Sequence, residues 1–367
     1  MFPAVPQRVE FVLAVPGSAA EWPRVSVVIP VRNEAAYIEN NLEALRAQDY
    51  PADRIEVLVA DGRSDDATRE IVNSVAERWK QDAAGNGCTV RIVDNPERVM
   101  PTGVNAAIRV ATGDLVLLLG GHAKLPPSYI RECAQVLLEH DVDGTSGAVE
   151  SVSHGTVGEA IAALMSSPFG IGNSDFRTAK GGGKPVAADT IPFPLFRRRV
   201  YERIGLYNPH MVRHQDYEFN YRVRQSGGRM LLIPGLKATY HVRSSLRVLW
   251  RQYWQYGVYK GRFVRRFPKS LKLRHLVPSI FTLAVVIAAV AAIFHPLGRL
   301  ALLGLLLPYG FFLMAAVMSF ATEKKWKTAL LAPAVMFCLH FGYGLGIWVG
   351  LLQGPVPAAP AFDTGSR

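Results

Sequence analysis

Acidic and amide side chains follow two short apolar runs near the start of the chain. The runs cover residues 25–31 and 57–60, and the polar residues at their ends are Asn33, Glu34, Asp61 and Asp65. Apolar runs of this length are typical of buried strands. A carboxylate at the tip of such a strand can accept hydrogen bonds from a ribose or a base, and no glycine-rich dinucleotide or phosphate loop follows either run. The pattern predicts a nucleotide site of another kind.

Helical patterns separate these runs and a third one at residues 115–119. Strands that alternate with helices predict a doubly wound α/β sheet with mostly parallel pairing. Because the carboxyl ends of parallel strands meet at one edge of the sheet, the polar residues after each run are expected to lie together there.

Four ordered motifs resemble those of family 2 glycosyltransferases with a nucleotide-sugar-binding GT-A fold. They lie at residues 25–34 with 61–66, 103–114, 214–222 and 251–257. The last is similar to the membrane-anchored exopolysaccharide, succinoglycan-type branch. The resemblance covers roughly residues 25–265 and implies a Rossmann-like mixed sheet.

This resemblance implies an inverting glycosyltransferase. It would move a hexose from a nucleoside diphosphate sugar, a uridine one by preference, to a lipid-linked or polysaccharide acceptor at a membrane. Asp61 and Glu34 would contact the nucleotide, and Pro30, Asn33 and Asp65 would shape its pocket.

Asp216 is the candidate catalytic base. An inverting transfer needs one carboxylate that takes the proton of the acceptor hydroxyl, and Asp216 lies in the motif that resembles the family's base motif. The alternative reading is an ordinary carboxylate at the start of a helix, where the dipole favours it. Glu218 is expected either to contact the acceptor or to pair with Arg222.

The chain departs from the family pattern after residue 119. There the family resembled has Asp-x-Asp or Asp-x-His, which holds a divalent cation at the diphosphate, whereas this chain has Gly120, Gly121 and His122. Three readings stay open. His122 and His241 could hold a metal with water and the diphosphate, and imidazole suits Mn²⁺ or another transition ion better than Mg²⁺. Alternatively, Arg, Lys and backbone amides stabilise the diphosphate, or the chain is inactive.

The segment 246–267 is aromatic on one helical face and basic on the other, which predicts a helix along the membrane surface. The resemblance adds that Gln252 could line the acceptor channel and that Lys260 or Arg262 could reach the diphosphate.

Composition points to a membrane protein. Of 367 residues, 49% are hydrophobic and only 19% are charged, and residues 276–294, 300–321 and 329–352 contain no Asp, Glu, Lys or Arg. A crossing helix needs about 20 such residues, so three spans are predicted. Basic clusters at 260–274 and 324–327 predict a cytoplasmic amino-terminal domain and an external carboxyl terminus of a multi-pass protein in the cell membrane. These clusters favour anionic lipid headgroups, and no nucleic-acid partner is expected.

The expected organisation has six parts. They are an extension at 1–24, a nucleotide-sugar-binding half at 25–125, an acceptor and catalytic half at 126–243, an interfacial segment at 244–275, the spans at 276–352 and a tail at 353–367. The rival function is a catalytically inactive assembly or regulatory subunit of a glycan-synthesis complex, which Gly120 favours. A processive synthase is disfavoured because the spans are few and the Gln-x-x-Arg-Trp motif is absent.

Overall fold

A mixed sheet forms the centre of the α/β domain, which we define as residues 22–245. The computed structural model describes residues 22–82, 87–121, 123–171 and 183–362. The strands are β1 Val25–Val31, β2 Ile55–Asp61, β3 Thr89–Asp94, β4 Leu115–Leu118, β5 Ala123–Lys124, β6 Gly144–Val152, β7 Val186–Ala187, β8 Leu195–Arg197 and β9 Met230–His241. Among the described residues their order is β3-β2-β1-β4-β8-β6-β9-β5, and β7 pairs with β9.

The amino-terminal half of this sheet is parallel, as the sequence predicted. β1 pairs in parallel with both β2 and β4, and β2 pairs in parallel with β3. The second half is mixed, because β8 runs antiparallel to both β4 and β6 whereas β6 runs parallel to β9. The carboxyl ends of β1, β2 and β4 therefore open on one edge.

Helices cover both faces of the sheet because its central strands are apolar on both sides. Val27 and Ile29 of β1 face one cluster and Val28 faces the other. The first cluster is completed by α1 Ile38–Arg46, α2 Thr68–Gln81 and α4 Tyr129–Glu139. The second is completed by α3 Met100–Val110, α8 Arg198–Ile204 and α9 Gln215–Gln225. Short 3-10 turns lie at η2 Ala52–Arg54 and η3 Pro268–Ser270.

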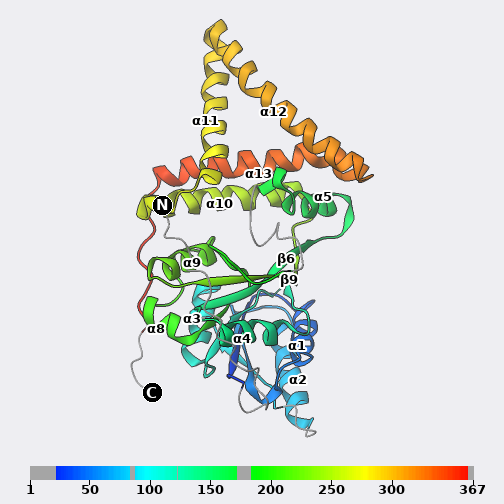
Figure 1. The fold of residues 1–367 in the computed structure, drawn as a ribbon, viewed down its shortest axis with the longest axis vertical. Helices are drawn as coiled ribbons and strands as arrows, with labels where there is room; N and C mark the ends of the chain where they lie inside the picture. The colour runs from blue at the N-terminus through cyan, green and yellow to red at the C-terminus, as the bar shows by residue number, and fades with distance from the viewer. Residues whose placement is uncertain (1–21, 83–86, 122, 172–182, 363–367) are drawn as a thin grey trace.

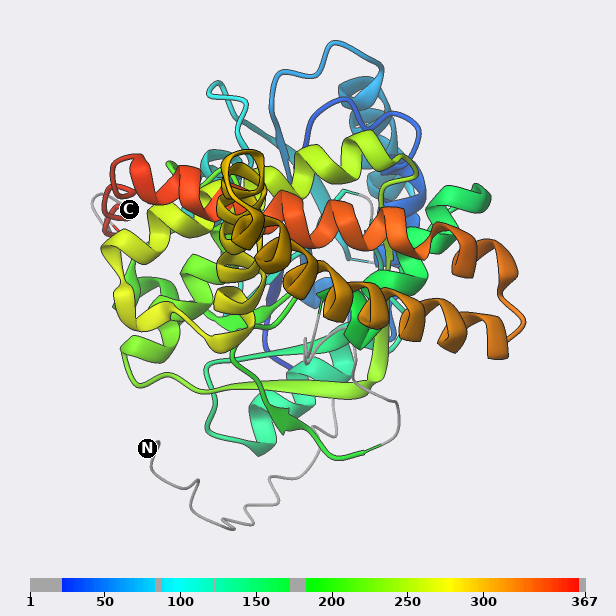
Figure 2. The ribbon, with the colours of Figure 1, turned by 90° about the horizontal axis from the view of Figure 1, so that it is seen from above.

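A separate layer of helices lies above the sheet (Figure 1). Its members are α5 Gly155–Met165, α6 Pro168–Ile171, α10 Leu246–Arg266, α11 Leu273–Phe294, α12 Pro296–Thr322 and α13 Trp326–Leu352. The last three are long and apolar enough to cross a membrane. α11 rises away from the α/β domain, α12 slants back towards it, and α13 then runs along α10 (Figures 1 and 2).

Glycines allow α10 and α13 to touch backbone to backbone. They are Gly257 and Gly261 on α10 and Gly346 and Gly350 on α13. A Cβ atom on any of the four would overlap backbone atoms of the facing helix. Such small residues let two helices approach closely in an apolar layer, and the contact continues into a cluster with α5 through Leu249 and Leu339.

The chain after α13 returns to the α/β domain. The Asn208 side-chain amide donates to the Pro357 carbonyl at 2.8 Å, and the Leu206 amide donates to the Pro360 carbonyl at 3.2 Å. Val356 is fully buried in one cluster with Met211 and Tyr217. Segments joined in this way lie on the same side of any bilayer.

The expected external carboxyl terminus stays a prediction, and these contacts favour the alternative in which the tail lies on the side of the α/β domain. Part of the apolar composition of α13 serves contacts with other helices. Half of its most apolar window (50%) is buried within the protein, compared with 17% for α11 and 6% for α12. A helix buried between other helices and one in lipid both lack charges, so the run 329–352 looks the same in either setting.

We expect Gly350→Val to destabilise the protein, because its side chain would strike the backbone of Val258 on α10. Overpacking of this kind costs about 1–3 kcal/mol, so the melting temperature of the full chain in detergent should fall. Gly310→Val on α12 is the matched control, since no described atom lies within 4 Å of the added Cβ. Equal melting temperatures for both variants would contradict the backbone contact.

Candidate active site

The turns after β1 and β2 are tied to each other. The Asn33 amide donates to the Ser64 hydroxyl at 2.9 Å, and the Asp65 amide donates to the Asn33 side-chain oxygen at 3.0 Å. Asn33 adopts a left-handed backbone with φ of 58°, which Asn tolerates better than most residues. Pro30 is paired in register with Ala60 of β2. The structure thus brings these sequence-predicted residues to one edge.

Asp61 is held rigidly at this edge. Its side chain is 1% exposed and accepts hydrogen bonds from the Ser64 hydroxyl at 2.5 Å and from the Arg69 guanidinium at 2.8 Å. Arg69 also donates to Asp94 at the end of β3 at 2.8 Å. Sequence reasoning missed Arg69, whose place at the start of α2, one turn beyond the Asp61 motif, was the available signal.

Glu34 lies between the ends of β1 and β4. A Cβ atom on Gly121 would be 3.2 Å from the carboxyl carbon of Glu34. Burial and the nearby Asp66 carboxylate raise the pKa of Glu34 to about 7, while the Arg243 guanidinium acts in the opposite direction. Glu34 is consequently only partly ionised at neutral pH, and Arg243 is the cation that faces it.

Asp216 opens onto a large cavity. Its side chain is exposed in the first turn of α9, and the preceding His214 turns the chain with a left-handed φ of 59°. The cavity has a volume of about 1380 Å³, and both Asp216 and Gly120 line it. The candidate base and the strand end that lacks the usual carboxylate therefore share one space.

The Lys260 ammonium group packs against the first turn of α9. Lys260 of α10 is 1% exposed, and its Nζ lies 3.6 Å from the centre of the Tyr217 ring. Burial, together with the Lys260 charge, lowers the pKa of His214 to about 3. The His214 imidazole next to Asp216 is therefore neutral in the working range of pH.

The structure places three expected contact residues away from the cavity. Glu218 is buried and forms a two-pronged ion pair with Arg222 at 2.7 and 3.0 Å, which is the second of its two expected roles. Lys260 is enclosed under Tyr217, and Arg262 donates to the Gly354 carbonyl in the carboxyl-terminal tail at 3.2 Å. Neither cation belongs to the cavity wall among the described residues. Arg262 is instead one of several arginines that hold the end of α13.

Other polar residues do face the cavity. Gln252 lines it and donates to the Tyr256 hydroxyl at 2.8 Å. Arg213, Arg243 and Arg251 line it as well, although sequence reasoning gave them no role. Arg213 lies beside the motif at 214–222 and Arg251 opens the motif at 251–257, and these positions were the signal that could have found them. Arg243 lies two residues after His241, outside the quoted motifs.

The described residues do not form a metal site by themselves. No group of three His, Cys, Asp or Glu side chains among them could hold an ion. His122 lies outside the described residues. Its neighbour Ala123 pairs with Tyr240, which precedes His241, and the His241 ring centre is 5.9 Å from that of His154. A divalent ion at Gly120 would thus need ligands beyond the described side chains, such as the diphosphate and water.

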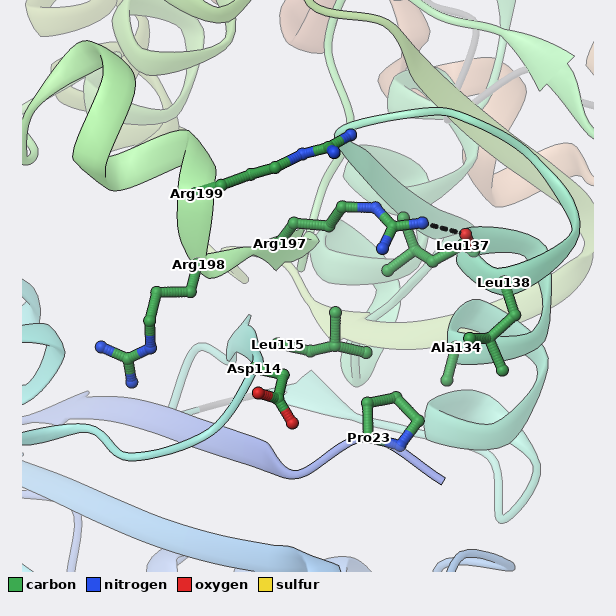
Figure 3. A pocket seen from close by; sticks show the side chains of 9 residues that line it. All are labelled: Pro23, Asp114, Leu115, Ala134, Leu137, Leu138, Arg197, Arg198 and Arg199. Carbon is green, nitrogen blue, oxygen red and sulfur yellow. Dashed lines mark hydrogen bonds between the residues drawn. The ribbon is translucent and has the colours of Figure 1, made fainter. Parts of the chain in front are cut away.

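A second, smaller cavity lies where the parallel strands begin, at the opposite edge of the sheet (Figure 3). Its volume is about 190 Å³. The arginines around it are used internally, since Arg197 donates to the Leu137 and Val142 carbonyls and Arg198 to the Gly113 and Ala111 carbonyls. These arginines therefore hold the surrounding backbone, and Asp216 does not line this cavity.

The chain is similar to known proteins over much of its length. The chain is 27% identical over 332 residues to the succinoglycan biosynthesis protein ExoA of Rhizobium meliloti (strain 1021). This alignment covers 89% of this chain and 94% of that protein. It is 26% identical over 248 residues to a dolichyl N-acetyl-α-D-glucosaminyl phosphate 3-β-D-2,3-diacetamido-2,3-dideoxy-β-D-glucuronosyltransferase of Methanococcus voltae, covering 66% and 74% of the two chains.

A solved structure shows the same fold. The mannosyltransferase PcManGT of Pyrobaculum calidifontis, in complex with GDP-Man and Mn²⁺, superposes with a TM-score of 0.53 at 22% identity, over 91% of each chain. The α/β domain therefore has the GT-A fold. Residues 26–205 match the family model described as glycosyl transferase family 2. The chain is accordingly a glycosyltransferase, and about half of it matches family 2.

Proposed function

We propose that this glycosyltransferase moves a hexose, with inversion, from a nucleoside diphosphate sugar to a lipid-linked or membrane-presented acceptor. The observation that carries the proposal is the shared cavity of Asp216 and Gly120 at the carboxyl edge of the sheet. The nucleotide would bind beside Asp61, Asn33 and Glu34, and a uridine nucleotide remains the preferred expectation. The anomeric carbon would then lie between Gly120 and Asp216.

In this mechanism Asp216 accepts the proton of the acceptor hydroxyl as the oxygen attacks the anomeric carbon from the side opposite the diphosphate. The left-handed turn at His214 sets the carboxylate at the rim of α9, where it is exposed to the cavity. The neutral imidazole of His214 adds no charge that would weaken Asp216 as a base. Arg243, which faces Glu34, is placed to stabilise charge on the departing diphosphate.

The membrane arrangement supports an acceptor delivered from the bilayer. Lys324, Lys325 and Lys327 lie in the turn between α12 and α13 and at the start of α13, and the basic end of α10 precedes α11. Positive residues favour the cytoplasmic side. We propose that the α/β domain, this turn and the tail are cytoplasmic and that α11 and α12 alone cross. The name of the Methanococcus voltae relative, which specifies a dolichyl-linked sugar phosphate, favours a lipid-linked acceptor.

Metal dependence stays a proposal. The Mn²⁺ in the Pyrobaculum calidifontis structure and the imidazole of His241 favour Mn²⁺ over Mg²⁺. A bound ion would neutralise charge on the diphosphate when it leaves. The described residues do not complete such a site, so the steps assigned to Asp216 and Arg243 above do not depend on it.

Asp216→Asn tests the base directly. The amide keeps the shape of the side chain but cannot take a proton, so turnover should fall by a factor on the order of 10² to 10⁴ while affinity for the nucleotide sugar stays similar. Turnover is measured as release of nucleoside diphosphate in the presence of acceptor, and affinity by thermal shift.

Asp53→Asn is the matched control, since that carboxylate is 64% exposed on η2 before β2, at the opposite edge of the sheet. It should behave as the wild type. Near-normal turnover of Asp216→Asn would remove Asp216 from the mechanism. Donor binding by the wild type without transfer to any acceptor would instead favour an assembly subunit.

Gly120→Asp tests the metal proposal. The nearest atom to an added Cβ is Cε1 of Phe193 at 3.6 Å, an ordinary contact, so the root of the new side chain fits. The added carboxylate should tighten Mn²⁺ binding in the presence of nucleoside diphosphate, as read from the spin-resonance signal of free Mn²⁺. His241→Ala should weaken that binding, whereas exposed His140→Ala at the end of α4 should not.

Full activity in excess chelator, together with unchanged Mn²⁺ binding in Gly120→Asp and His241→Ala, would contradict the metal proposal. The diphosphate would then be stabilised by cationic side chains and backbone amides. In that case Arg243→Ala should lower turnover more than His241→Ala does, because it removes a charge that acts in the transition state.

A further inference from the structure

The cavity at Asp216 extends beyond the sugar-transfer site into the apolar helices. At one end it is lined by Gly120, Arg213 and Asp216 of the α/β domain. At the other it is lined by residues of α11, α12 and α13, among them Phe281, Leu305, Tyr309, Phe312, Leu339 and His340. A hexose would occupy only a fraction of its volume of about 1380 Å³.

One face of each apolar helix builds this second half. On α12 the lining positions include Leu305, Pro308, Tyr309 and Phe312, which are spaced by three or four residues. On α11 Val277 and Phe281 are four residues apart, and α13 contributes Leu339 and Tyr343 at the same spacing. Such spacing puts the side chains on a single stripe of each helix. From Gly304 to Phe312 the stripe on α12 is about 12 Å long at 1.5 Å per residue.

A hydrogen-bonded chain fixes the far wall of this space. The Tyr309 hydroxyl of α12 lies 3.2 Å from Nδ1 of His340 on α13, and Nε2 of His340 lies 3.0 Å from the Phe169 carbonyl of α6. The rings of Phe281 and Tyr309, with centres 5.0 Å apart, join α11 to α12. The apolar half is therefore bounded by helices that are tied to one another and to the α/β domain.

Two arginines of the cavity wall come from the α/β domain and from α10, the helix that connects this domain to the apolar helices. Arg251 is exposed on α10, one turn after Val248, which also lines the cavity. Arg213 precedes the base motif and donates from Nε to the Gln255 side chain of α10 at 3.0 Å. Within the described residues neither arginine takes part in a salt bridge. Arg243 differs, because it faces Glu34 at the donor end.

We propose that the second half of the cavity binds the hydrocarbon chain of the acceptor lipid and that Arg213 and Arg251 bind the phosphate that joins chain to sugar. The ligand is thus a long-chain lipid phosphate whose sugar end reaches Asp216. Guanidinium groups bind phosphate with two parallel hydrogen bonds, and the apolar stripes of α11 and α12 take up the chain. This inference deepens the proposed function and rests on it for the identity of the acceptor site.

Binding of hexadecyl phosphate to the full chain in detergent, in the absence of any nucleotide, tests the proposal. Hexadecanol is the uncharged comparison, and both are followed by native mass spectrometry. Wild-type protein should prefer the phosphate. The Arg251→Ala variant should bind hexadecyl phosphate about 10-fold or more weakly and lose that preference. Arg251→Gln, whose side chain is longer than that of alanine, serves as a second variant. Leu305→Trp should weaken both lipids by filling the apolar half.

Matched controls lie on the same helices. Arg247→Ala removes an exposed charge of α10 that does not line the cavity, and Leu303→Trp adds bulk to an exposed position of α12 that points elsewhere. Both should bind like the wild type. Equal binding by Leu305→Trp and Leu303→Trp, or no preference for phosphate in the wild type, would overturn the proposal.

Binding of the nucleotide-sugar donor is measured in a separate experiment. Stabilisation of the wild type by nucleotide sugar is measured without lipid. If the nucleotide sugar stabilises the protein but the lipid results fail, the acceptor site is wrong and the proposed function stands. If the lipid results hold without any nucleotide-sugar binding, the proposed function fails and the lipid site remains.

Discussion

Direct backbone contact between α10 and α13 is the constraint on which the rest of the structure depends. Glycines on both helices remove the side chains that would separate them. Because α13 lies along α10, α11 leads away from the layer of these two helices and α12 leads back to it, as Figure 1 shows. The other residues of α10, including Arg251 and Gln252, are then free to form one wall of the cavity that holds Asp216. One helix thereby joins the membrane layer to the site of chemistry.

The carboxyl-terminal tail gives α9 a second support. Val356 of the tail and Phe263 of α10 meet Tyr217 and Tyr221 of α9 in one buried cluster. The guanidinium groups of Arg265 and Arg266 donate to carbonyls of Leu351, Gln353 and Val356 and so hold the end of α13 in place. The base helix is therefore clamped between the α/β domain, α10 and the tail. This arrangement uses the basic residues before α11 for internal contacts as well as for any attraction to lipid headgroups.

The elements built from local pattern were predictable from sequence. Apolar runs at β1, β2 and β4 and the polar residues after them placed the carboxyl edge of the parallel strands correctly, because strand alternation and parallel pairing leave few alternatives. Asp216 was found through a motif. The features that the sequence did not reveal depend on long-range contacts. Nothing local shows that Arg262 would hold Gly354 or that an uncharged run such as 329–352 would lie on another helix. The α5 helix, which packs on α13, was missed for the same reason.

In the proposed topology, the tail and the α/β domain lie on one side of the membrane, and only α11 and α12 cross it. Single cysteines at Leu297, Lys324 and Ala358, probed in intact cells with an impermeant thiol reagent, test this directly. All three sites are exposed, whereas the native cysteines Cys88, Cys133 and Cys338 are buried. The proposed topology predicts labelling at Leu297 from outside and at Lys324 and Ala358 only after permeabilisation. Labelling of Ala358 from outside would mean that α13 crosses the bilayer, and it would contradict the packing of α13 on α10 and the cavity that depends on it.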